Sequence, residues 1–365
     1  LGIPRNDDMT GENQEGAGYY QLTQRNARRS SAAMAYLAPN RHRPNLTVRT
    51  GAQVKRITVE GARATGVEMM DGSRIMATSE VLLASGAIGS PRMLMLSGIG
   101  PADHLAEVGV TPVFDQAGVG GNFQDHLDLF VIAEVTGPHT YDRYAKPHWS
   151  ALAGLEYLLT RKGPVASSLF ETGGFWYADK DARSPDIQFH LGLGSGIEAG
   201  VAAMPNGGVT LNSAYLRPRS RGTVRLASAD PAAAPLIDPN YWEDPRDREM
   251  SIKGLKLARE IMAQAPLRPF ILAERLPGPD VRTDRDYFDF ACRHAKTDHH
   301  PAGTCRMGSD PAAVVDPRLR FNGIAGLRVV DASIMPTVVS SNTNAPTIMI
   351  AEKAADMIKA DHGAR

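Results

Sequence analysis

Residues 299–308 read HHPAGTCRMG, and residues 327–356 read LRVVDASIMPTVVSSNTNAPTIMIAEKAAD. In the first run a histidine pair directly precedes Pro301, and the backbone around a proline favours extended and turn conformations. In the second run we expect a short apolar strand over 327–330. This strand ends at Asp331, so polar groups follow its carboxyl end.

The second run also predicts a helix and its start. Asn342 and Asn344 precede Pro346, and a helical pattern follows over 347–358. An Asn just before a helix and a Pro in its first turn are typical of a helix N-terminus. The stretch thus combines an imidazole, a strand-end acid and the positive end of a helix, as a site for a developing anion requires. A buried strand–turn–helix with satisfied polar caps is the structural alternative.

Length and composition describe a globular protein. The chain has 365 residues, enough for one large or two ordinary cores, and 42% of them are hydrophobic. Lys+Arg and Asp+Glu both number 40, and no basic block occurs, which argues against a nucleic-acid partner. No window approaches 18 apolar residues, so we expect no transmembrane segment.

The two cysteines, Cys292 and Cys305, provide no disulfide framework and favour a reducing compartment, here the cytoplasm. With His294, His299 and His300 they offer metal-ligand atom types. Their spacing matches neither CxxC nor HxxxH, so we expect no metal site.

Periodicity and turn residues predict a mixed α/β chain with a change of character near residue 127. The predicted helices are 26–37, 149–160, 244–264 and 284–294, with further helices after Gly89 and after Pro101. A β-meander is expected over 46–50, 54–59, 64–70 and 74–76, and a strand buried on both faces over 80–84. The runs 170–177, 186–191, 209–216 and 223–226 predict an antiparallel sheet.

Two common enzyme motifs are missing. The one near match to GxGxxG, at 194–199, is followed by a break at Pro205 and by no acidic residue about 20 positions on, so we do not expect it to hold a dinucleotide. No GxSxG sequence supplies a serine nucleophile.

Several long runs resemble the glucose–methanol–choline family of FAD-dependent oxidoreductases, in particular its choline- and alcohol-dehydrogenase-like members. These runs are 86–101, 118–126, 216–226, 300–308, 329–336 and 342–347. The resemblance extends from end to end of the chain. It implies an FAD-binding domain interleaved with a substrate domain built on a mostly antiparallel sheet. The expected segments are 1–126 (FAD-binding), 127–295 (substrate-binding) and 296–365 (return to the FAD-binding domain).

The resemblance also implies the chemistry. A primary alcohol is oxidised to an aldehyde as hydride passes to flavin N5, His300 acts as the base, and Asn342 hydrogen-bonds the same oxygen. Reduced flavin then passes its electrons to a quinone-like acceptor or to oxygen. The expected cofactor contacts are Val54, Asn122, Asp331, Ala332, Asn344 and Pro346, and His299 is expected to support His300 or line the substrate pocket. Glu171, in the run SLFETGGF, is a further candidate for the substrate pocket, with a solvated or capping role as the alternative.

The sequence departs from the family pattern at its front. Family members open with a glycine-rich strand–turn–helix that holds the FAD pyrophosphate, whereas this chain begins Leu1-Gly2-Ile3-Pro4. We therefore expect a fragment that binds FAD weakly or not at all. Two alternatives stay open: a non-redox lyase resembling the family's hydroxynitrile lyases, and an inactive, FAD-free binding module. The alcohol, the oligomeric state and peripheral contact with an inner membrane are not decided by the sequence.

Overall fold

The computed structural model describes residues 1–195 and 204–363, which form two compact units. Unit 1 consists of 1–46, 127–216 and 245–298, and unit 2 of 47–126, 217–244 and 299–365. In the described residues no helix is both long and apolar enough to cross a membrane.

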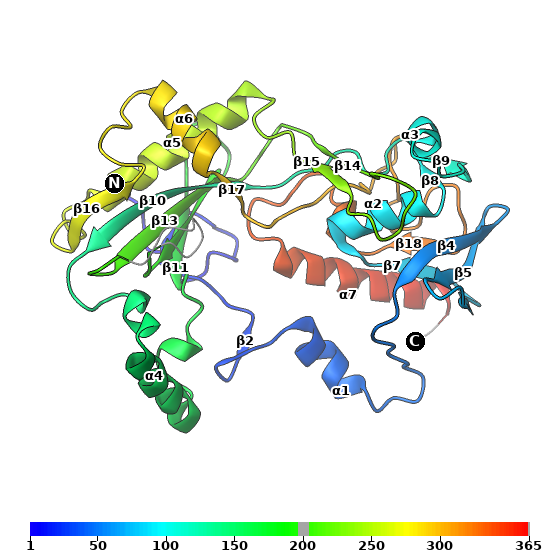
Figure 1. The fold of residues 1–365 in the computed structure, drawn as a ribbon, viewed down its shortest axis with the longest axis horizontal. Coiled ribbons are helices and arrows are strands. Elements are labelled where there is room, and N and C mark those ends of the chain that lie inside the picture. Colours follow the sequence, from blue (N-terminus) through cyan, green and yellow to red (C-terminus); the bar gives the residue numbers. More distant parts are fainter. Residues whose placement is uncertain (196–203, 364–365) are drawn as a thin grey trace. The chain divides into compact units, whose positions relative to one another are not determined.

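Unit 1 is built on one antiparallel sheet (Figure 1). Its strand order is β1 (Gly16–Tyr19), β11 (Thr172–Trp176), β12 (Ile187–Gly192), β13 (Gly208–Tyr215), β10 (Leu127–Val135) and β16 (Ile271–Leu276), while β17 (Lys296–Thr297) also pairs with β10. Almost every residue of β10 and β13 is buried, so these two strands form the centre of the unit.

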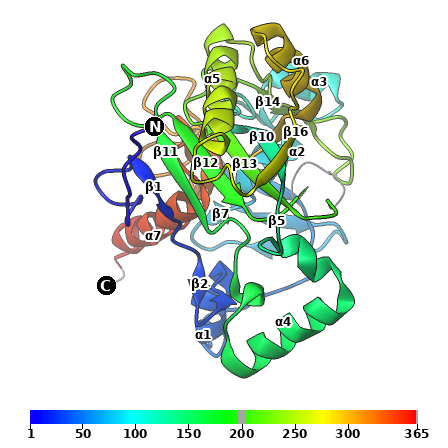
Figure 2. The same ribbon diagram turned by 90° about the vertical axis from the view of Figure 1, so that its left-hand side faces the viewer.

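Helix α5 (Pro245–Met262) covers one face of this sheet, as Figure 2 shows. Its apolar stripe, predicted from helical periodicity, includes the buried Ile252, Leu255 and Ala258. Helix α6 (Asp284–His294) begins with a capping box between Thr283 and Asp286. Over the part of unit 1 that the structure describes, the other helices are the π-helical η1 (Ala33–Leu37), α1 (Ala38–Asn40), η2 (Tyr141–Ala145), α4 (Pro147–Thr160) and η3 (Pro164–Ala166).

The described residues of unit 2 form four small sheets. The meander β4 (Val54–Glu60), β5 (Arg63–Met69) and β6 (Arg74–Met76) is antiparallel, as is the pair β14 (Thr223–Arg225) and β15 (Leu236–Asp238). The pairs β7 (Val81–Leu83) with β18 (Leu327–Val329), and β8 (Ile99–Gly100) with β9 (Phe114–Asp115), are parallel. The helices are α2 (Gly86–Leu96), α3 (Ala102–Glu107), η4 (Ala332–Ile334) and α7 (Asn344–Asp361).

One apolar core joins these pieces of unit 2. It contains residues from α2, β18, α7 and the loop after His300, including Leu94, Val329, Ile350 and Cys305. The core thereby fixes the two runs of sequence that carry the predicted site.

Several predicted elements were wrong. The helix expected over 26–37 starts instead as a hairpin of β2 (Gln24–Arg25) and β3 (Arg28–Arg29), because Asn26 and Ala27 take left-handed backbone angles. No strand forms over 46–50. In β7, Leu82 is 49% exposed, so this strand is not buried on both faces.

The predicted segment boundaries near 127 and 296 fall close to breaks between the units, but two stretches differ. Residues 1–46 lie in unit 1 rather than with the rest of 1–126, and residues 217–244 lie in unit 2. The second difference arises because β14 pairs with β15 and does not join the large antiparallel sheet. The assignment of the segments to FAD and to substrate stays a prediction.

Candidate active site

Two loops of unit 2 are joined around His300. Gln124 and Ala302 exchange backbone hydrogen bonds of 3.0 and 2.9 Å. The Asp125 carboxylate strengthens this junction, because its Oδ1 accepts from the backbone N–H of both His126 (2.9 Å) and His300 (2.8 Å). Its Oδ2 accepts from the hydroxyl of Tyr241 at 2.6 Å.

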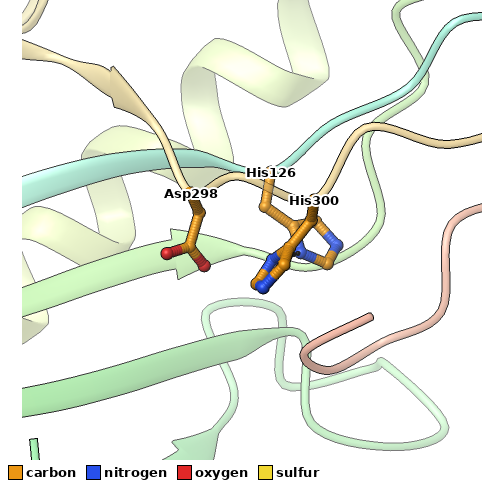
Figure 3. Close-up of side chains that lie close together, drawn as sticks. All are labelled: His126, Asp298 and His300. Atoms are coloured by element: carbon orange, nitrogen blue, oxygen red, sulfur yellow. Dashed lines mark hydrogen bonds between the residues drawn. The ribbon is translucent and has the colours of Figure 1, made fainter. Parts of the chain in front are cut away.

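This frame places the rings of His126 and His300 together (Figure 3). The rings meet edge to face, with centroids 5.1 Å apart and planes at 85°. The two Nδ1 atoms are 3.0 Å apart, and His300 Nε2 lies 3.2 Å from Asn342 Nδ2. His126 is fully buried and His300 is 7% exposed, so the hydrogen bond between the two rings forms largely out of water. Asp298, also drawn in Figure 3, ends the preceding segment of unit 1.

The side chain of His299 does not share the buried position of His126 and His300. Its φ is +59°, and its side chain is exposed whereas that of His300 is buried. Successive side chains therefore have different surroundings, which supports His300 as the base candidate. The pocket role of His299 stays a prediction.

The N-terminus of α7 lies immediately after Asn342. Thr343 is the N-cap and makes no side-chain capping hydrogen bond, and Asn344 and Pro346 occupy the first turn. The N-terminal end of an 18-residue helix carries a partial positive charge and suits a group that gains negative charge. Asn342 and Asn344 are both exposed, so this end of the helix is accessible.

Asp331 has a structural task. Its Oδ2 accepts from the backbone N–H of Gly86 (3.0 Å) and from the Ser90 hydroxyl (2.5 Å), while Oδ1 accepts from the N–H of Ser333 (2.8 Å). The carboxylate therefore occupies the positive end of α2 and connects it to β18. Ala332, which follows it, is half-buried and could offer backbone contact to a ligand.

Asn122 holds three segments together. Its Nδ2 donates to the carbonyls of Gly303 (3.1 Å) and Pro336 (3.3 Å), and its Oδ1 accepts from Arg221 Nε (3.0 Å). A Cβ at Gly303, where φ is +91°, would lie 2.6 Å from the Asn122 carbonyl oxygen, so only glycine allows this approach. Val54, another predicted cofactor contact, is half-buried at the start of β4.

Comparison with known proteins identifies the family. The N- and C-terminal domains described as GMC oxidoreductase match residues 1–128 and 218–351. The chain belongs to the GMC oxidoreductase family. It is 44% identical over 363 residues to human mitochondrial choline dehydrogenase, covering 98% of this chain and 61% of the human protein.

Solved GMC oxidoreductase structures have the same fold, which confirms the predicted mixed α/β class. Pyridoxine 4-oxidase from Mesorbium loti matches with a TM-score of 0.86 and 32% identity, over 98% of this chain and 67% of that one. An Aspergillus oryzae formate oxidase studied for its FAD modification matches with a TM-score of 0.86 and 26% identity, over 93% and 65%. The family and these neighbours imply FAD.

The residues of unit 2 fit one end of that cofactor. The start of α7 suits the electron-accepting ring, which gains negative charge on reduction. The N-terminus of α2 does not offer its N–H groups to the pyrophosphate in the same way, because Asp331 already occupies it. The GxGxxG near match at 194–199 lies partly outside the described residues.

We therefore expect the 365-residue chain by itself to lose most added FAD during gel filtration. The reason is that the described residues offer a helix N-terminus suited to the ring but no glycine-rich anion site for the phosphates. The flavin absorbance of the protein peak, divided by its protein concentration, measures retention. One flavin per chain would contradict this prediction.

Glu171 belongs to unit 1. It lies just before β11 and lines a pocket of about 290 Å³ together with His139, Tyr141 and Tyr144. The Tyr141 hydroxyl donates to Glu171 Oε1 at 3.1 Å, and burial, followed by the nearby carboxylate, raises the pKa of Tyr141. The substrate-pocket role of Glu171 stays a prediction. A carboxylate among aromatic rings is nevertheless a suitable environment for a cation.

The cysteine positions give no support to a metal site. Cys305 is fully buried in the core of unit 2, and this burial, reinforced by the charge of Asp331, strongly raises the pKa of its thiol. A neutral buried thiol is a poor metal ligand, since the thiolate is the form that binds.

Sequence reasoning missed three residues of the site: Asp125, His126 and Tyr241. Asp125 and His126 stand in the run 118–126 that resembles the family, but no spacing rule connects them with His300, which is 174 positions from His126. Tyr241 had no signal in the sequence.

Proposed function

We propose that this chain is the catalytic portion of an FAD-dependent enzyme that oxidises a primary alcohol to an aldehyde. The observation that carries this proposal is the buried His300, whose Nε2 lies 3.2 Å from the amide of Asn342. The imidazole nitrogen and the amide face each other at this distance, so one alcohol oxygen that displaces their mutual contact can hydrogen-bond to both. The start of α7 follows two residues later.

His300 Nε2 would take the hydroxyl proton as the alcohol is oxidised, because an unprotonated imidazole nitrogen can act as a general base. Asn342 Nδ2 would donate to the oxygen as it gains negative charge. Holding the alcohol between the two groups also orients its carbinol carbon. Bound FAD would supply the hydride acceptor for that carbon, so one proton and one hydride leave the alcohol.

The cofactor roles of Val54, Asn122, Asp331, Ala332, Asn344 and Pro346 are part of this proposal. The arrangement at Asp331 and Asn122 supports indirect roles for their side chains, since each is already hydrogen-bonded within the protein. Glu171 and His299 are proposed to contact the substrate. A cationic alcohol such as choline would suit Glu171, and the similarity to choline dehydrogenase supports that class.

The proposed electron acceptor is either a quinone-like compound or oxygen, because the similar proteins include one named as a dehydrogenase and one named as an oxidase. The cytoplasmic location, with or without contact at an inner membrane, stays a prediction.

The test is to incubate the FAD-containing full-length enzyme with choline and other primary alcohols, once with a quinone analogue and once with oxygen. We expect one aldehyde per acceptor molecule reduced. Cleavage of a cyanohydrin without acceptor reduction would instead indicate a lyase, and ligand binding without turnover would indicate a binding module.

A further inference from the structure

We propose that His126 is a positioning residue that fixes the tautomer of His300. In this arrangement His300 carries its proton on Nδ1 and donates it to the Nδ1 lone pair of His126. Nε2 of His300 is then left unprotonated. The catalytic consequence rests on the proposed function, whereas the tautomer itself does not.

The contacts restrict where the protons lie. Two Nδ1 atoms 3.0 Å apart form a hydrogen bond only if one carries a proton and the other does not. Asn342 Nδ2, an amide donor, faces His300 Nε2 at 3.2 Å and needs a lone pair there. Both contacts are satisfied together when His300 is protonated on Nδ1 and His126 on Nε2.

The alternative places every proton on the opposite side. If the amide of Asn342 were turned, its oxygen would accept from a protonated Nε2 of His300, and His126 would donate through Nδ1. His300 would then have no lone pair on the nitrogen that faces Asn342. The two arrangements differ in which ring nitrogen of His300 carries the proton, and this can be measured directly.

The backbone holds the pair in place without help from a ligand. Asp125 Oδ1 binds the backbone N–H of both histidines, and the Gln124–Ala302 bridge fixes the loops on which they stand. Tyr241 in turn donates to the other oxygen of Asp125. His126 can therefore orient the His300 ring as well as select its tautomer.

The consequence for catalysis concerns the lone pair. A base must present an unprotonated nitrogen to the hydroxyl, and selection of the tautomer by a partner on the other ring nitrogen is how such bases are prepared. When Nε2 takes the substrate proton, the Nδ1–H that points to His126 becomes part of an imidazolium, and hydrogen bonds from charged donors are stronger. His126 touches no reacting atom in this scheme.

The test is long-range ¹H–¹⁵N NMR on the chain labelled with ¹⁵N-histidine, which distinguishes protonated from unprotonated ring nitrogens. A His300→Gln variant assigns the His300 signals. We expect His300 to be protonated on Nδ1 in the wild-type chain. In His126→Phe, which keeps a ring but removes the acceptor, we expect a shift toward the Nε2-protonated form, and His126→Gln, which keeps an acceptor, should shift less.

The exposed His42 provides a control, since His42→Gln should leave the His300 signals unchanged. Protonation on Nε2 in the wild-type chain would overturn the proposal, and so would an unchanged tautomer in a folded His126→Phe. If that variant fails to fold, the wild-type spectrum alone decides.

A kinetic measurement separates this inference from the proposed function. In the FAD-containing enzyme, His126→Phe should lower kcat roughly 10–10²-fold, with a smaller effect on KM for the alcohol. If the tautomer is as proposed but kcat is unchanged, the catalytic part of the inference fails.

Discussion

Replacing His300 with alanine lowers turnover of the FAD-containing enzyme by about 10²–10⁴-fold, the usual contribution of a positioned general base. The loss is expected in both kcat and kcat/KM, because the proton is transferred in the transition state. His300 is buried and hydrogen-bonded to His126 and Asn342, so a water molecule cannot readily replace it as the base. Steady-state assays with the preferred alcohol measure the effect.

The matched control is His42→Ala, which removes an exposed imidazole from unit 1 and should leave turnover unchanged. Added imidazole should restore part of the activity of His300→Ala and none in His42→Ala. Turnover of His300→Ala within the same order of magnitude as wild type would contradict the assignment of the base.

Arg328→Met lowers the free energy of unfolding by about 3–5 kcal/mol, the cost of removing one partner from a buried ion pair. Only 4% of the Arg328 side chain is exposed. Its Nε donates to Glu80 and its Nη2 to Asp361, both at 2.5 Å, and its Nη1 donates to the carbonyl of Arg318 at 2.8 Å. The variant would leave two carboxylates without this partner where α7 ends against β7 and β18.

Urea unfolding measures that loss. Arg285→Met is the matched control, because Arg285 is 79% exposed and its i,i+4 pair with Asp289 is screened by solvent and should contribute little. An equal effect of the two substitutions would show that the buried network does not stabilise unit 2.

The same network predicts a pH dependence. Burial of Glu80 opposes ionisation, but hydrogen bonds from Arg328 and His362 outweigh it and lower the pKa of Glu80. The hydrogen bond from Arg328 lowers the pKa of Asp361. A pKa lowered in the folded state stabilises the protein fully above the unfolded value of about 4 and loses that effect as pH falls further. The stability difference between wild type and Arg328→Met should therefore shrink from pH 7 to pH 3, and a constant difference would contradict this cause.

Local signals in the sequence predicted much of the fold. The apolar stripe of α5, the helical pattern of α6 and the Asn–Pro start of α7 each depend on neighbouring residues, and each helix forms where expected. The errors have tertiary causes. The pattern of 26–37 suits a helix, but left-handed angles at Asn26 and Ala27 produce a hairpin, and a strand pattern at 223–226 does not reveal that its partner is β15.

In the candidate site, too, the sequence predicted the residues with local signals and not the tertiary contacts. His300 and Asn342 were found from their local surroundings and from the family resemblance. The contacts of His300 with Asp125 and His126 join residues 175 and 174 positions apart, which no periodicity encodes. Asp331 was predicted to lie against the cofactor, and the sequence could not show that its carboxylate is already bonded to α2.

The most direct measurement of the central claim is the flavin absorbance of the FAD-containing enzyme after anaerobic mixing with a primary alcohol. Alcohol oxidation predicts that the oxidised flavin band disappears as one equivalent of aldehyde forms, with a rate greatly reduced in His300→Ala. An unchanged flavin band, with every tested alcohol recovered intact, would contradict it.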